Sequence, residues 1–297
     1  MSGPVLRRLL RPPVIPLPRP VSQLGEGAPR GFAAPPGFAA PAMARRVAET
    51  TPNATLIARH DHTPHVATFL IRPDDPSVAH VAGQYASLGL EFDGASLQRP
   101  YSMASLPGGW DWEFHIRRVR DGAFTSRLFE LAPGARLRLG PAKGRFILDA
   151  DDTRPHLFMA TGTGVAPFVA MLRAEIASGR PRPVTLLHGA AHADELGYAT
   201  LLREWAGDGV PLRYIPTISR PADQRNAGWD GTVGRAEDVL DRDWERLGLD
   251  PAATVAYLCG NPGMVAAAEA TLLARGLPAD HVRREAYWLD RAEASAA

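Results

Sequence analysis

The run Arg99-Pro100-Tyr101-Ser102 places a fixed cation, an aromatic ring and a small hydroxyl within four residues. Because alternate residues of an extended strand point to opposite faces, Arg99 and Tyr101 share one side, and Ser102 presents its hydroxyl from the other side or from the strand's edge. A guanidinium group can bind a phosphate, and a tyrosine ring offers a flat face. The run therefore suits a planar cofactor that carries a phosphate. The alternative is a hairpin strand whose tyrosine covers a barrel end and whose arginine is solvated.

A second run, Thr161-Gly162-Thr163-Gly164, follows an apolar segment and opens a helical pattern with Pro167 in its first turn. Backbone amides at the start of a helix can bind a pyrophosphate. Proline at this position costs no hydrogen bond, because its missing donor would have no partner there. A glycine pair also occurs in plain tight turns, but the order of strand, glycines and helix favours phosphate binding here.

Composition limits the classes of protein to which the chain can belong. Its 297 residues, 45% of them apolar, suffice for two packed cores. No apolar run approaches the ~20 residues that a membrane-spanning helix needs, so we do not expect the chain to be an integral membrane protein. Cys259 is the only cysteine, which excludes a disulfide or a cysteine-ligated iron–sulfur cluster within this chain.

The first 42 residues differ from the rest in composition. They hold ten prolines, five arginines, one glutamate and a repeated Gly-Phe-Ala-Ala-Pro. Proline removes hydrogen-bond donors and breaks helices, so residues 1–44 are expected to form a disordered Pro-rich extension. A native start at Met43 is the alternative. Without the first 42 residues the chain carries 28 basic and 31 acidic residues, so the small positive net charge belongs to this extension.

Two different patterns of secondary structure follow along the chain. Short β-branched and aromatic segments, spaced by Pro, Asp and Gly turns, predict an antiparallel barrel or sandwich that closes near Leu148. From there on, apolar strands alternate with helices, which predicts a parallel sheet covered on both faces, with ligands at the carboxyl ends of its strands. The expected strands are 54–59, 66–72, 80–90, the run that begins at Arg99, 111–119, 136–139, 155–160, 183–188, 212–219 and 254–259. The expected helices are 125–131, 165–178, 195–205, 236–246 and 262–275.

Four motifs, taken in order and separation, resemble the ferredoxin/flavodoxin–NADP reductase family, and its bacterial members most. They are Arg99-Pro100-Tyr101-Ser102, Gly162-Thr163-Gly164-Val165-Ala166-Pro167, Cys259-Gly260-Asn261-Pro262 with Met264, and Glu285-Ala286-Tyr287-Trp288. The resemblance covers residues 45–288. It implies an antiparallel β-barrel FAD-binding domain over 45–150 and an α/β parallel-sheet NADP-binding domain over 151–297. The implied activity is that of an FAD-dependent oxidoreductase, a ferredoxin/flavodoxin–NADP(+) reductase, which moves hydride between NADP(H) and FAD and single electrons between FAD and a carrier.

The resemblance also implies roles for individual residues. Arg99 is expected to bind the FAD phosphate, Tyr101 to stack on the isoalloxazine and Ser102 to form a hydrogen bond near its N5. Gly122, Thr125 and Ser126 match a second pyrophosphate contact, although Thr125 is equally well explained as a simple N-cap. The remaining expected cofactor contacts are Pro100, His115, Ile116, Arg117, Thr161, Gly162, Thr163, Gly164, Gly260, Asn261 and Met264.

The implied catalytic group comprises Ser102, Cys259, Glu285 and Tyr287. Cys259 is expected to lie against the nicotinamide as a positioning residue, because a small side chain permits close approach; a small buried hydrophobe is the alternative. Tyr287 is expected to shield the isoalloxazine and Trp288 to cover the FAD adenine. Nine residues follow Trp288, a departure from the bacterial pattern that puts the adenine contact in question.

The preference for NADP over NAD is predicted from the carboxylates that the sequence lacks and the arginines that it holds at the expected nucleotide site. A carboxylate at the end of the second parallel strand would bind the 2′-hydroxyl of NAD, but residues 188–193 contain no acid. Arg220 and Arg235 match the family's 2′-phosphate arginines. Ala191 is a departure, since similar reductases often carry arginine there, and His192 is the candidate substitute.

The resemblance implies an acidic electron carrier, ferredoxin or flavodoxin, and a cytoplasmic monomer without a metal, nucleic-acid or membrane partner. Between Ala95 and Phe146 the chain holds nine basic and four acidic residues, which predicts a positive docking face with Arg118, Arg120, Arg136 and Lys143. Two alternatives stay open: the reductase component of an oxygenase that prefers NADH, and a non-catalytic nucleotide-binding sensor of the same fold.

Overall fold

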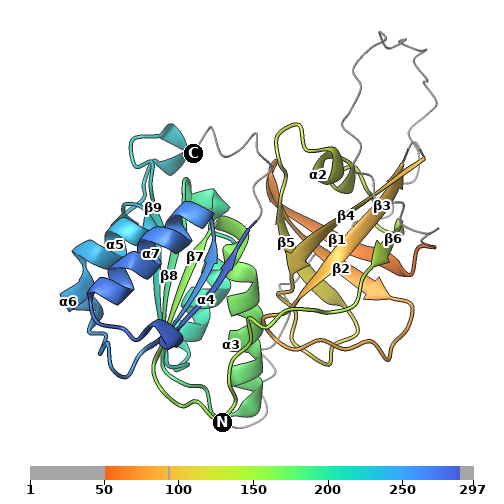
Figure 1. Cartoon of the computed structure of the whole chain (residues 1–297). Coiled ribbons are helices and arrows are strands. Elements are labelled where there is room, and N and C mark those ends of the chain that lie inside the picture. Colours follow the sequence, from red (N-terminus) through yellow and green to blue (C-terminus); the bar gives the residue numbers. More distant parts are fainter. Residues whose placement is uncertain (1–50, 93, 288–297) are drawn as a thin grey trace.

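The chain forms two six-stranded sheets that lie side by side (Figure 1). The computed structural model describes residues 51–92 and 94–287. The predicted extension over 1–44, Trp288 and the nine residues after it lie outside the described residues. The predicted class, an antiparallel barrel followed by a parallel α/β sheet, is confirmed.

The first sheet is antiparallel, in the order β4-β3-β6-β1-β2-β5. Its two outer strands meet where Met103, just after β4, forms a bridge to Phe114 of β5, and this contact closes the sheet into a barrel. The barrel interior is apolar, and Phe124 of helix α2 packs into it. The elements are β1 (Ala54–Thr63), β2 (Val66–Pro73), β3 (Tyr85–Phe92), β4 (Ala95–Ser102), β5 (Trp112–Arg117), α2 (Ala123–Leu128) and β6 (Arg136–Leu139).

The second sheet is parallel throughout, in the order β10-β9-β8-β7-β11-β12. Its strands are β7 (His156–Thr161), β8 (Val184–Ala190), β9 (Leu212–Ile218), β10 (Thr232–Val233), β11 (Val255–Gly260) and β12 (Val282–Ala286). Its helices are α3 (Ala166–Ser178), α4 (Ala199–Gly207), α5 (Ala236–Arg242), α6 (Trp244–Leu247) and α7 (Pro262–Ala274). Short 3-10 turns, η1 (Gly162–Val165), η2 (Ala193–Glu195), η3 (Gln224–Asn226) and η4 (Ala279–His281), connect them.

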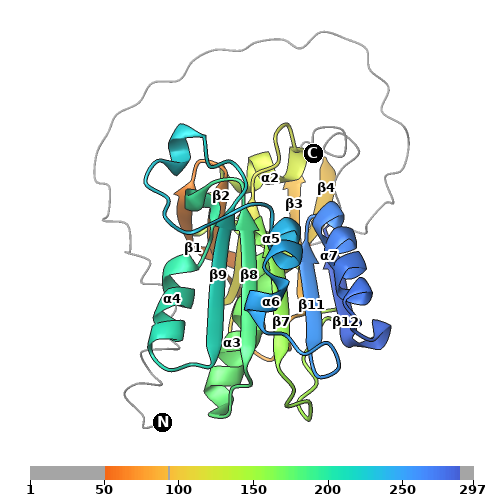
Figure 2. The same cartoon turned by 90° about the vertical axis from the view of Figure 1, so that its left-hand side faces the viewer.

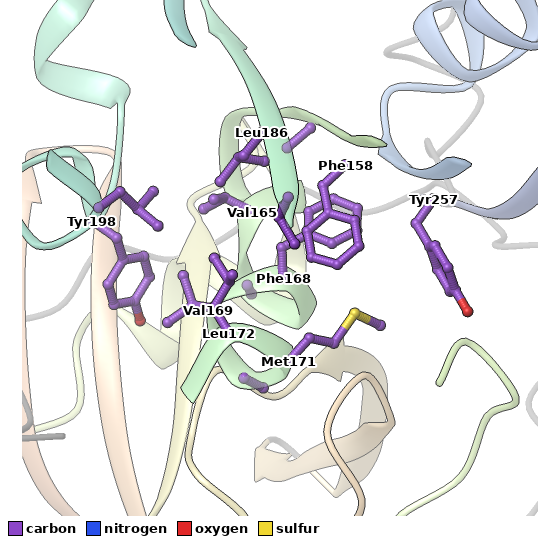
Figure 3. Packing of buried hydrophobic residues seen from close by; sticks show 14 of the residues in the cluster. Phe158, Val165, Phe168, Val169, Met171, Leu172, Leu186, Tyr198 and Tyr257 are labelled. Carbon is purple, nitrogen blue, oxygen red and sulfur yellow. The ribbon is translucent and has the colours of Figure 1, made fainter. Parts of the chain in front are cut away.

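Helices lie on both faces of this sheet (Figure 2). Alternation along the strands sends apolar side chains to both of these faces. On β7, Phe158 points to the side of α3 and α4, whereas Leu157 and Met159 point to the side of α5, α6 and α7. Figure 3 shows the α3 side, where the rings of Phe158 and Phe168 stack with their centroids 4.6 Å apart. Near-continuous apolar runs are typical of strands that are buried on both faces.

The structure departs from the predicted elements at several places, and the two-residue strand β10 was not expected. The helix expected over 195–205 begins at Ala199, because Tyr198 adopts a left-handed backbone conformation (φ 62°). The helix expected over 236–246 is interrupted at Asp243. Strand β3 begins only at Tyr85, because Gly83 before it turns the chain with φ 95°. Strand β12 was not expected, since the sequence Val-Arg-Arg-Glu-Ala is too polar to signal a strand.

Helix α3 lies between the parallel sheet and the barrel (Figure 1). Phe146, which ends the barrel half, packs against Phe168 of α3 at 5.8 Å and against Tyr257 of β11 at 5.3 Å between ring centroids. The core on this side of the sheet therefore continues into the barrel half. Among residues 51–92 and 94–287, no helix is long and apolar enough to cross a membrane.

Candidate functional site

Several of the predicted site residues meet at the carboxyl ends of β7 and β11. The chain runs from β7 outward through β8 to β10 and then returns to β11 on the other side of β7. Such a reversal of strand order opens a crevice in which parallel α/β sheets bind ligands. Residues 161–164, after β7, and residues 259–261, at the end of β11, meet there.

The loop after β7 touches the end of β11 so closely that only glycine fits. A Cβ atom on Gly164 would lie 2.4 Å from the Cys259 carbonyl oxygen, and one on Gly260, where φ is 137°, would lie 2.3 Å from Thr161 Oγ1. The same Thr161 hydroxyl accepts a hydrogen bond of 2.8 Å from the Asn261 amide. The loop, η1 and the start of α3 therefore form one rigid rim. The predicted start of α3 with a proline in its first turn is confirmed.

His188 of β8 contacts the backbone of this rim at Gly162. The sequence did not predict this role. Its Nε2 lies 2.9 Å from the Gly162 carbonyl oxygen and its Nδ1 lies 3.1 Å from the Tyr214 hydroxyl. Burial lowers the pKa of His188 to about 4, so the ring is neutral, with Nε2–H donating to Gly162 and Nδ1 accepting from Tyr214. The only signal in the sequence is a histidine in an apolar strand, which is more often an ordinary core residue.

Ser102 and Glu285 meet although 183 positions separate them in the chain. The Ser102 hydroxyl donates a 2.9 Å hydrogen bond to Glu285 Oε1. Glu285 reaches this place because β12 pairs with β11 in a register that sets Glu285 beside Cys259. Burial raises the pKa of the Glu285 carboxyl. A carboxyl group of raised pKa is thereby joined to a hydroxyl at the boundary between the two halves.

Cys259 and Tyr287 complete the group of four predicted catalytic residues. Cys259 has no exposed surface, and burial raises the pKa of its thiol well above the ordinary value. The thiol therefore stays protonated, as expected of a positioning residue and not of a nucleophile. Tyr287 donates from its hydroxyl to the Thr163 carbonyl oxygen at 2.9 Å, so its ring lies against the loop after β7. Whether it shields an isoalloxazine stays a prediction.

On the barrel side, in the first motif, Arg99 is exposed to solvent and Tyr101 is half-buried. The Arg99 guanidinium is exposed and bonds only the neighbouring Gln98 carbonyl oxygen among the residues described. Pro100 beside it is exposed too. The ring of Tyr101 stacks on Phe124 of α2 with centroids 5.9 Å apart. A guanidinium without an ion pair among the described residues and a supported aromatic ring lie two positions apart on β4, as a phosphate-bearing planar cofactor requires.

The turn before α2 is built around Gly122 and Thr125. A Cβ atom on Gly122 would lie 2.8 Å from Val119 Cβ. Thr125 is not the N-cap, because Gly122 holds that position and the Thr125 hydroxyl accepts a 2.9 Å hydrogen bond from the Val119 amide. This hydroxyl therefore stabilises the turn, while Ser126, half-buried in the first turns of α2, stays a predicted phosphate contact.

Four predicted cofactor contacts have side chains that are engaged elsewhere. Ile116 lies in the barrel core and Met264 in the core beneath α7. The His115 ring is buried beside Thr68, and Arg117 pairs with Glu195 at 3.4 Å. If these residues contact a cofactor, they do so through their backbone atoms.

At the other end of the crevice, Arg220 and Arg235 follow β9 and β10. Both are exposed, and neither side chain forms a hydrogen bond or an ion pair with another residue in the described ranges. Asp194, the first acid after β8, pairs with Arg225 at 2.7 Å. His192 is buried and bonds Asp223 at 3.0 Å. The suggested substitution of His192 for a missing arginine is therefore not supported, because its ring is already engaged.

The residues present fit both cofactors on geometry alone. Glycines at contact distance leave the rim of the β7 loop free of side chains, as close approach of a dinucleotide pyrophosphate requires. Arg99 on the barrel, and Arg220 and Arg235 on the parallel-sheet half, form no ion pair among the described residues. The Ser102–Glu285 contact joins these two halves.

Two family models match the chain, one on each half. The model described as "Oxidoreductase FAD-binding domain" matches residues 53–147, and the one described as "Oxidoreductase NAD-binding domain" matches residues 158–270.

Individual relatives cover most of the chain. Ferredoxin–NADP reductase B of Sorangium cellulosum is 34% identical over 242 residues, which are 79% of this chain and 96% of that protein. The ferredoxin–NAD(P)(+) reductase component of the naphthalene 1,2-dioxygenase system of Pseudomonas putida is 31% identical over 236 residues, 79% of this chain and 68% of that protein. A solved ferredoxin NADP+ reductase from Neisseria gonorrhoeae, with bound FAD and NADP, shares the fold at a TM-score of 0.70 and 24% identity, covering 80% of this chain and 98% of that one.

Proposed function

The chain belongs to the ferredoxin–NADP reductase family, and from this premise we propose that it transfers hydride between NADP(H) and FAD and single electrons between FAD and a ferredoxin or flavodoxin. FAD, when bound, supplies the step from two-electron to one-electron chemistry. The single observation that supports the proposal best is the Ser102–Glu285 hydrogen bond of 2.9 Å, which joins the flavin motif of the barrel to the edge strand beside Cys259.

Within this proposal, the chain's own residues bind, orient and handle protons. The Ser102 hydroxyl can donate or accept a proton at the flavin edge, and Glu285 holds a proton more readily than an exposed carboxyl because burial raises its pKa. Cys259 leaves room for the nicotinamide ring because its side chain is small, buried and protonated.

The two ends of the crevice are proposed to bind the two phosphate-bearing cofactors. Arg99 binds the FAD phosphate, and Tyr101, supported by Phe124, stacks on its ring system. Arg220 and Arg235 bind the 2′-phosphate of NADP(H), because both guanidinium groups are exposed and unpaired among the described residues. Trp288, outside the described residues, is kept as the proposed adenine contact.

The carrier, the assembly and the location belong to the same proposal. An acidic ferredoxin or flavodoxin fits the basic surplus between Ala95 and Phe146. We propose a cytoplasmic monomer, since its nucleotide substrate is found in the cytoplasm and both cofactors are accommodated within one chain. The domain limits that we propose are 45–150 for FAD and 151–297 for NADP(H).

The experiment that tests the proposal is the visible spectrum of the purified protein before and after addition of NADPH without oxygen. Flavin bands that bleach with NADPH and recover on addition of oxidised ferredoxin are expected. A protein without flavin bands would instead be a nucleotide-binding sensor of the same fold. Flavin bands that NADPH leaves unchanged would also contradict the proposal.

A second candidate is the reductase component of an oxygenase system. The observation in its favour is the 31% identity to the reductase component of naphthalene dioxygenase, together with Ala191 where a further phosphate-binding arginine is often found. Flavin that bleaches readily with NADH and slowly with NADPH would favour this candidate, because an oxygenase reductase is expected to prefer NADH.

A further inference from the structure

Strand β5 presents a polar face to the nucleotide-binding half. Its apolar residues point into the barrel core, so Glu113, His115 and Arg117 share the other face. This face meets the short segment 195–198 that follows β8. The contacts pair residues in order along the strand: Arg117 with Glu195 (3.4 Å), His115 with Gly197, and Glu113 with Tyr198 (2.6 Å between Oε1 and the hydroxyl).

The segment 195–198 is shaped to make these contacts. Tyr198 adopts φ 62°, an uncommon conformation for a tyrosine, and so ends the segment abruptly before α4. Gly197 lies so close to His115 that an added Cβ atom would be 2.0 Å from Nε2 of the ring. Figure 3 shows the Tyr198 ring beside Val169 and Leu172 of α3.

Arg173 of α3 completes the cluster from a third direction. Its side chain is 3% exposed, and its Nη1 donates to Glu113 Oε2 at 3.1 Å and to the Ala104 carbonyl oxygen at 2.6 Å. Ala104 follows Ser102 by two residues, and α3 begins directly after the loop 161–164. The Arg173 guanidinium therefore links the segment after β4, the strand that carries Arg99-Pro100-Tyr101-Ser102, to α3, the helix that begins directly after the loop 161–164.

Stability alone does not explain this arrangement. Removal of two charges from water is costly, and apolar residues of similar volume often stabilise a fold as well as a buried ion pair does. Here Nη2 of Arg173 even lacks a partner among the described residues. A directional cluster differs from apolar packing in fixing how two bodies are oriented, because its hydrogen bonds hold only over a narrow range of angles.

We propose that Arg173 and Tyr198, acting through Glu113, are positioning residues for hydride transfer. This inference rests on the proposed function. The cluster holds the nucleotide-binding half at one angle to the barrel, and thereby fixes the distance between the nicotinamide carbon that gives the hydride and the flavin nitrogen that accepts it. A misplacement of about 1 Å can reduce the rate of such a transfer by roughly 10²-fold.

The test replaces the whole cluster by apolar groups of similar size, in the variant Glu113→Leu/Arg173→Met/Tyr198→Phe. Its melting temperature and FAD content are expected to stay near those of the wild type. NADP+ affinity is expected to change by less than about threefold, because Arg220 and Arg235 are untouched. The rate of flavin reduction at saturating NADPH should fall at least about tenfold, and the long-wavelength absorbance of nicotinamide stacked on the isoalloxazine should weaken with it.

A matched control exists in the same half of the molecule. Buried Arg182 and half-buried Glu175 form another ion pair, 2.9 Å apart, which does not contact the first motif. The variant Glu175→Leu/Arg182→Met should leave the reduction rate and the stacking absorbance unchanged, whatever it does to the melting temperature. A triple variant that keeps the wild-type rate and stacking absorbance would overturn the proposal, as would an equal loss of rate in the control.

Two further comparisons keep the proposal falsifiable if the triple variant does not fold. Tyr198→Phe removes a single hydroxyl, and Arg173→Lys keeps the charge but replaces the planar guanidinium, whose donors point in fixed directions, with a rotatable ammonium on a flexible stem. Each should reduce the rate less than the triple variant would while leaving NADP+ affinity intact; wild-type rates in both would overturn the proposal. Failure of the proposed function is recognised separately, because then NADPH would not bleach even the wild-type flavin.

Discussion

Ser102 and Glu285 are the residues at which the two halves exchange a hydrogen bond next to the proposed reaction centre. The bond orients the serine hydroxyl, and because burial raises its pKa, the Glu285 carboxyl holds a proton more readily than an exposed carboxyl does. Neither property is visible in the first motif alone, because the partner comes from the other end of the chain.

Replacement of Ser102 by alanine tests this contact. Ser102→Ala should lower the rate of flavin reduction by NADPH about 10²-fold while FAD stays bound, because loss of positioned proton-transfer help typically costs that much. Stopped-flow absorbance measures the rate, and the flavin content of the purified variant checks binding. Ser96→Ala, at the other end of β4, is the matched control and should behave as the wild type. An unchanged rate in Ser102→Ala would remove the hydroxyl from the mechanism.

Arg235 is expected to decide which nicotinamide cofactor binds. A charge-assisted hydrogen bond to a phosphate is worth roughly 1.5–3 kcal/mol, so Arg235→Ala should raise the KM for NADPH by about one to two decades. The KM for NADH, which lacks the 2′-phosphate, should hardly change. Arg180→Ala, an exposed arginine just after the far end of α3, serves as the control. Equal losses with both nucleotides would mean that Arg235 holds the pyrophosphate or the fold.

His188 is expected to make the fold sensitive to acid. Its pKa is about 4 in the folded protein, against an ordinary value of 6.5 that applies when the chain is unfolded. Below pH 6.5 the unfolded chain takes up a proton that the folded protein does not, so the free energy of unfolding falls as the pH drops from 6.5 towards 4. The loss due to this residue is at most roughly 3 kcal/mol.

Denaturant unfolding of the wild type and of His188→Gln between pH 7 and pH 4 measures this effect. Glutamine can still donate to the Gly162 carbonyl oxygen but does not titrate, so the variant should lose less stability over this range. Burial also lowers the pKa values of His62 and His115. The free energy of unfolding should therefore still fall with pH in both proteins, though less steeply in the variant. Identical slopes would show that the ring of His188 is not the cause.

At the scale of elements, the rim formed by the loop 161–164 and the end of β11 depends on contact between backbones. Gly164→Ala would drive a methyl group to 2.4 Å from the Cys259 carbonyl oxygen, so the two strand ends must separate. We expect a loss of stability of about 1–3 kcal/mol and a large loss of NADP+ affinity, measured by thermal unfolding and by titration.

Gly179→Ala is the control for this element. Gly179 ends α3 with φ 74° and has open space around it. Its replacement should cost about 1 kcal/mol, because a left-handed conformation is strained for alanine, and should leave NADP+ affinity unchanged. If the two variants weaken NADP+ binding equally, the glycine contact at the rim is not what shapes the nucleotide site.

The sequence predicted the elements where local pattern and burial agree. Strands 54–59 and 212–219 lie within or overlap observed strands because their apolar residues alternate or run continuously. Strand β12 could not be predicted, because its Arg283 and Arg284 are exposed at a sheet edge and it depends on tertiary pairing with β11. The left-handed turn at Tyr198 could not be predicted either, because it accompanies a tertiary contact with Glu113 and not a local sequence preference.

The site shows the same division. Motifs with their own backbone geometry, such as the glycines of residues 162–164, could be found from spacing. His188 could not, because its role depends on a carbonyl group 26 positions away. The side chains of His115 and Arg117 lie at the contact between the two halves, which strand alternation alone does not reveal because it does not say what lies opposite a face. That these two residues contact a cofactor through their backbone atoms stays a prediction.

At the scale of the whole molecule, the basic surplus of the barrel half is smaller than the sequence suggests. Arg117 pairs with Glu195 of the other half. Arg136, expected on the docking face, is bound to Asp74 and to the hydroxyl of Thr55, so it is engaged within the barrel and is removed from that face. Arg118, Arg120 and Lys143 are left as candidates. No hydrogen bond or ion pair joins their side chains to another residue within the described ranges.

These candidates lie close to the flavin motif. Lys143 forms a bridge with Tyr85, which in turn pairs with Ser102 across β3 and β4. Arg120 stands in the turn that leads to Gly122 and α2. A positive face at this place would orient an acidic carrier with the flavin edge towards it, and would raise the rate of encounter most at low salt.

The charge-reversed variant Arg120→Glu/Lys143→Glu tests the docking face. It should reduce ferredoxin or flavodoxin more slowly than the wild type at ~0.05 M salt, and the difference should shrink near 0.5 M, where the Debye length is only ~4 Å. Turnover of NADPH with ferricyanide should stay near the wild-type rate, because a small acceptor needs no docking face. Arg180→Glu, the same change of charge on the nucleotide-binding half, should leave carrier reduction unchanged. If carrier reduction responds neither to the double reversal nor to salt, the carrier binds elsewhere and this basic cluster is ordinary solvated surface.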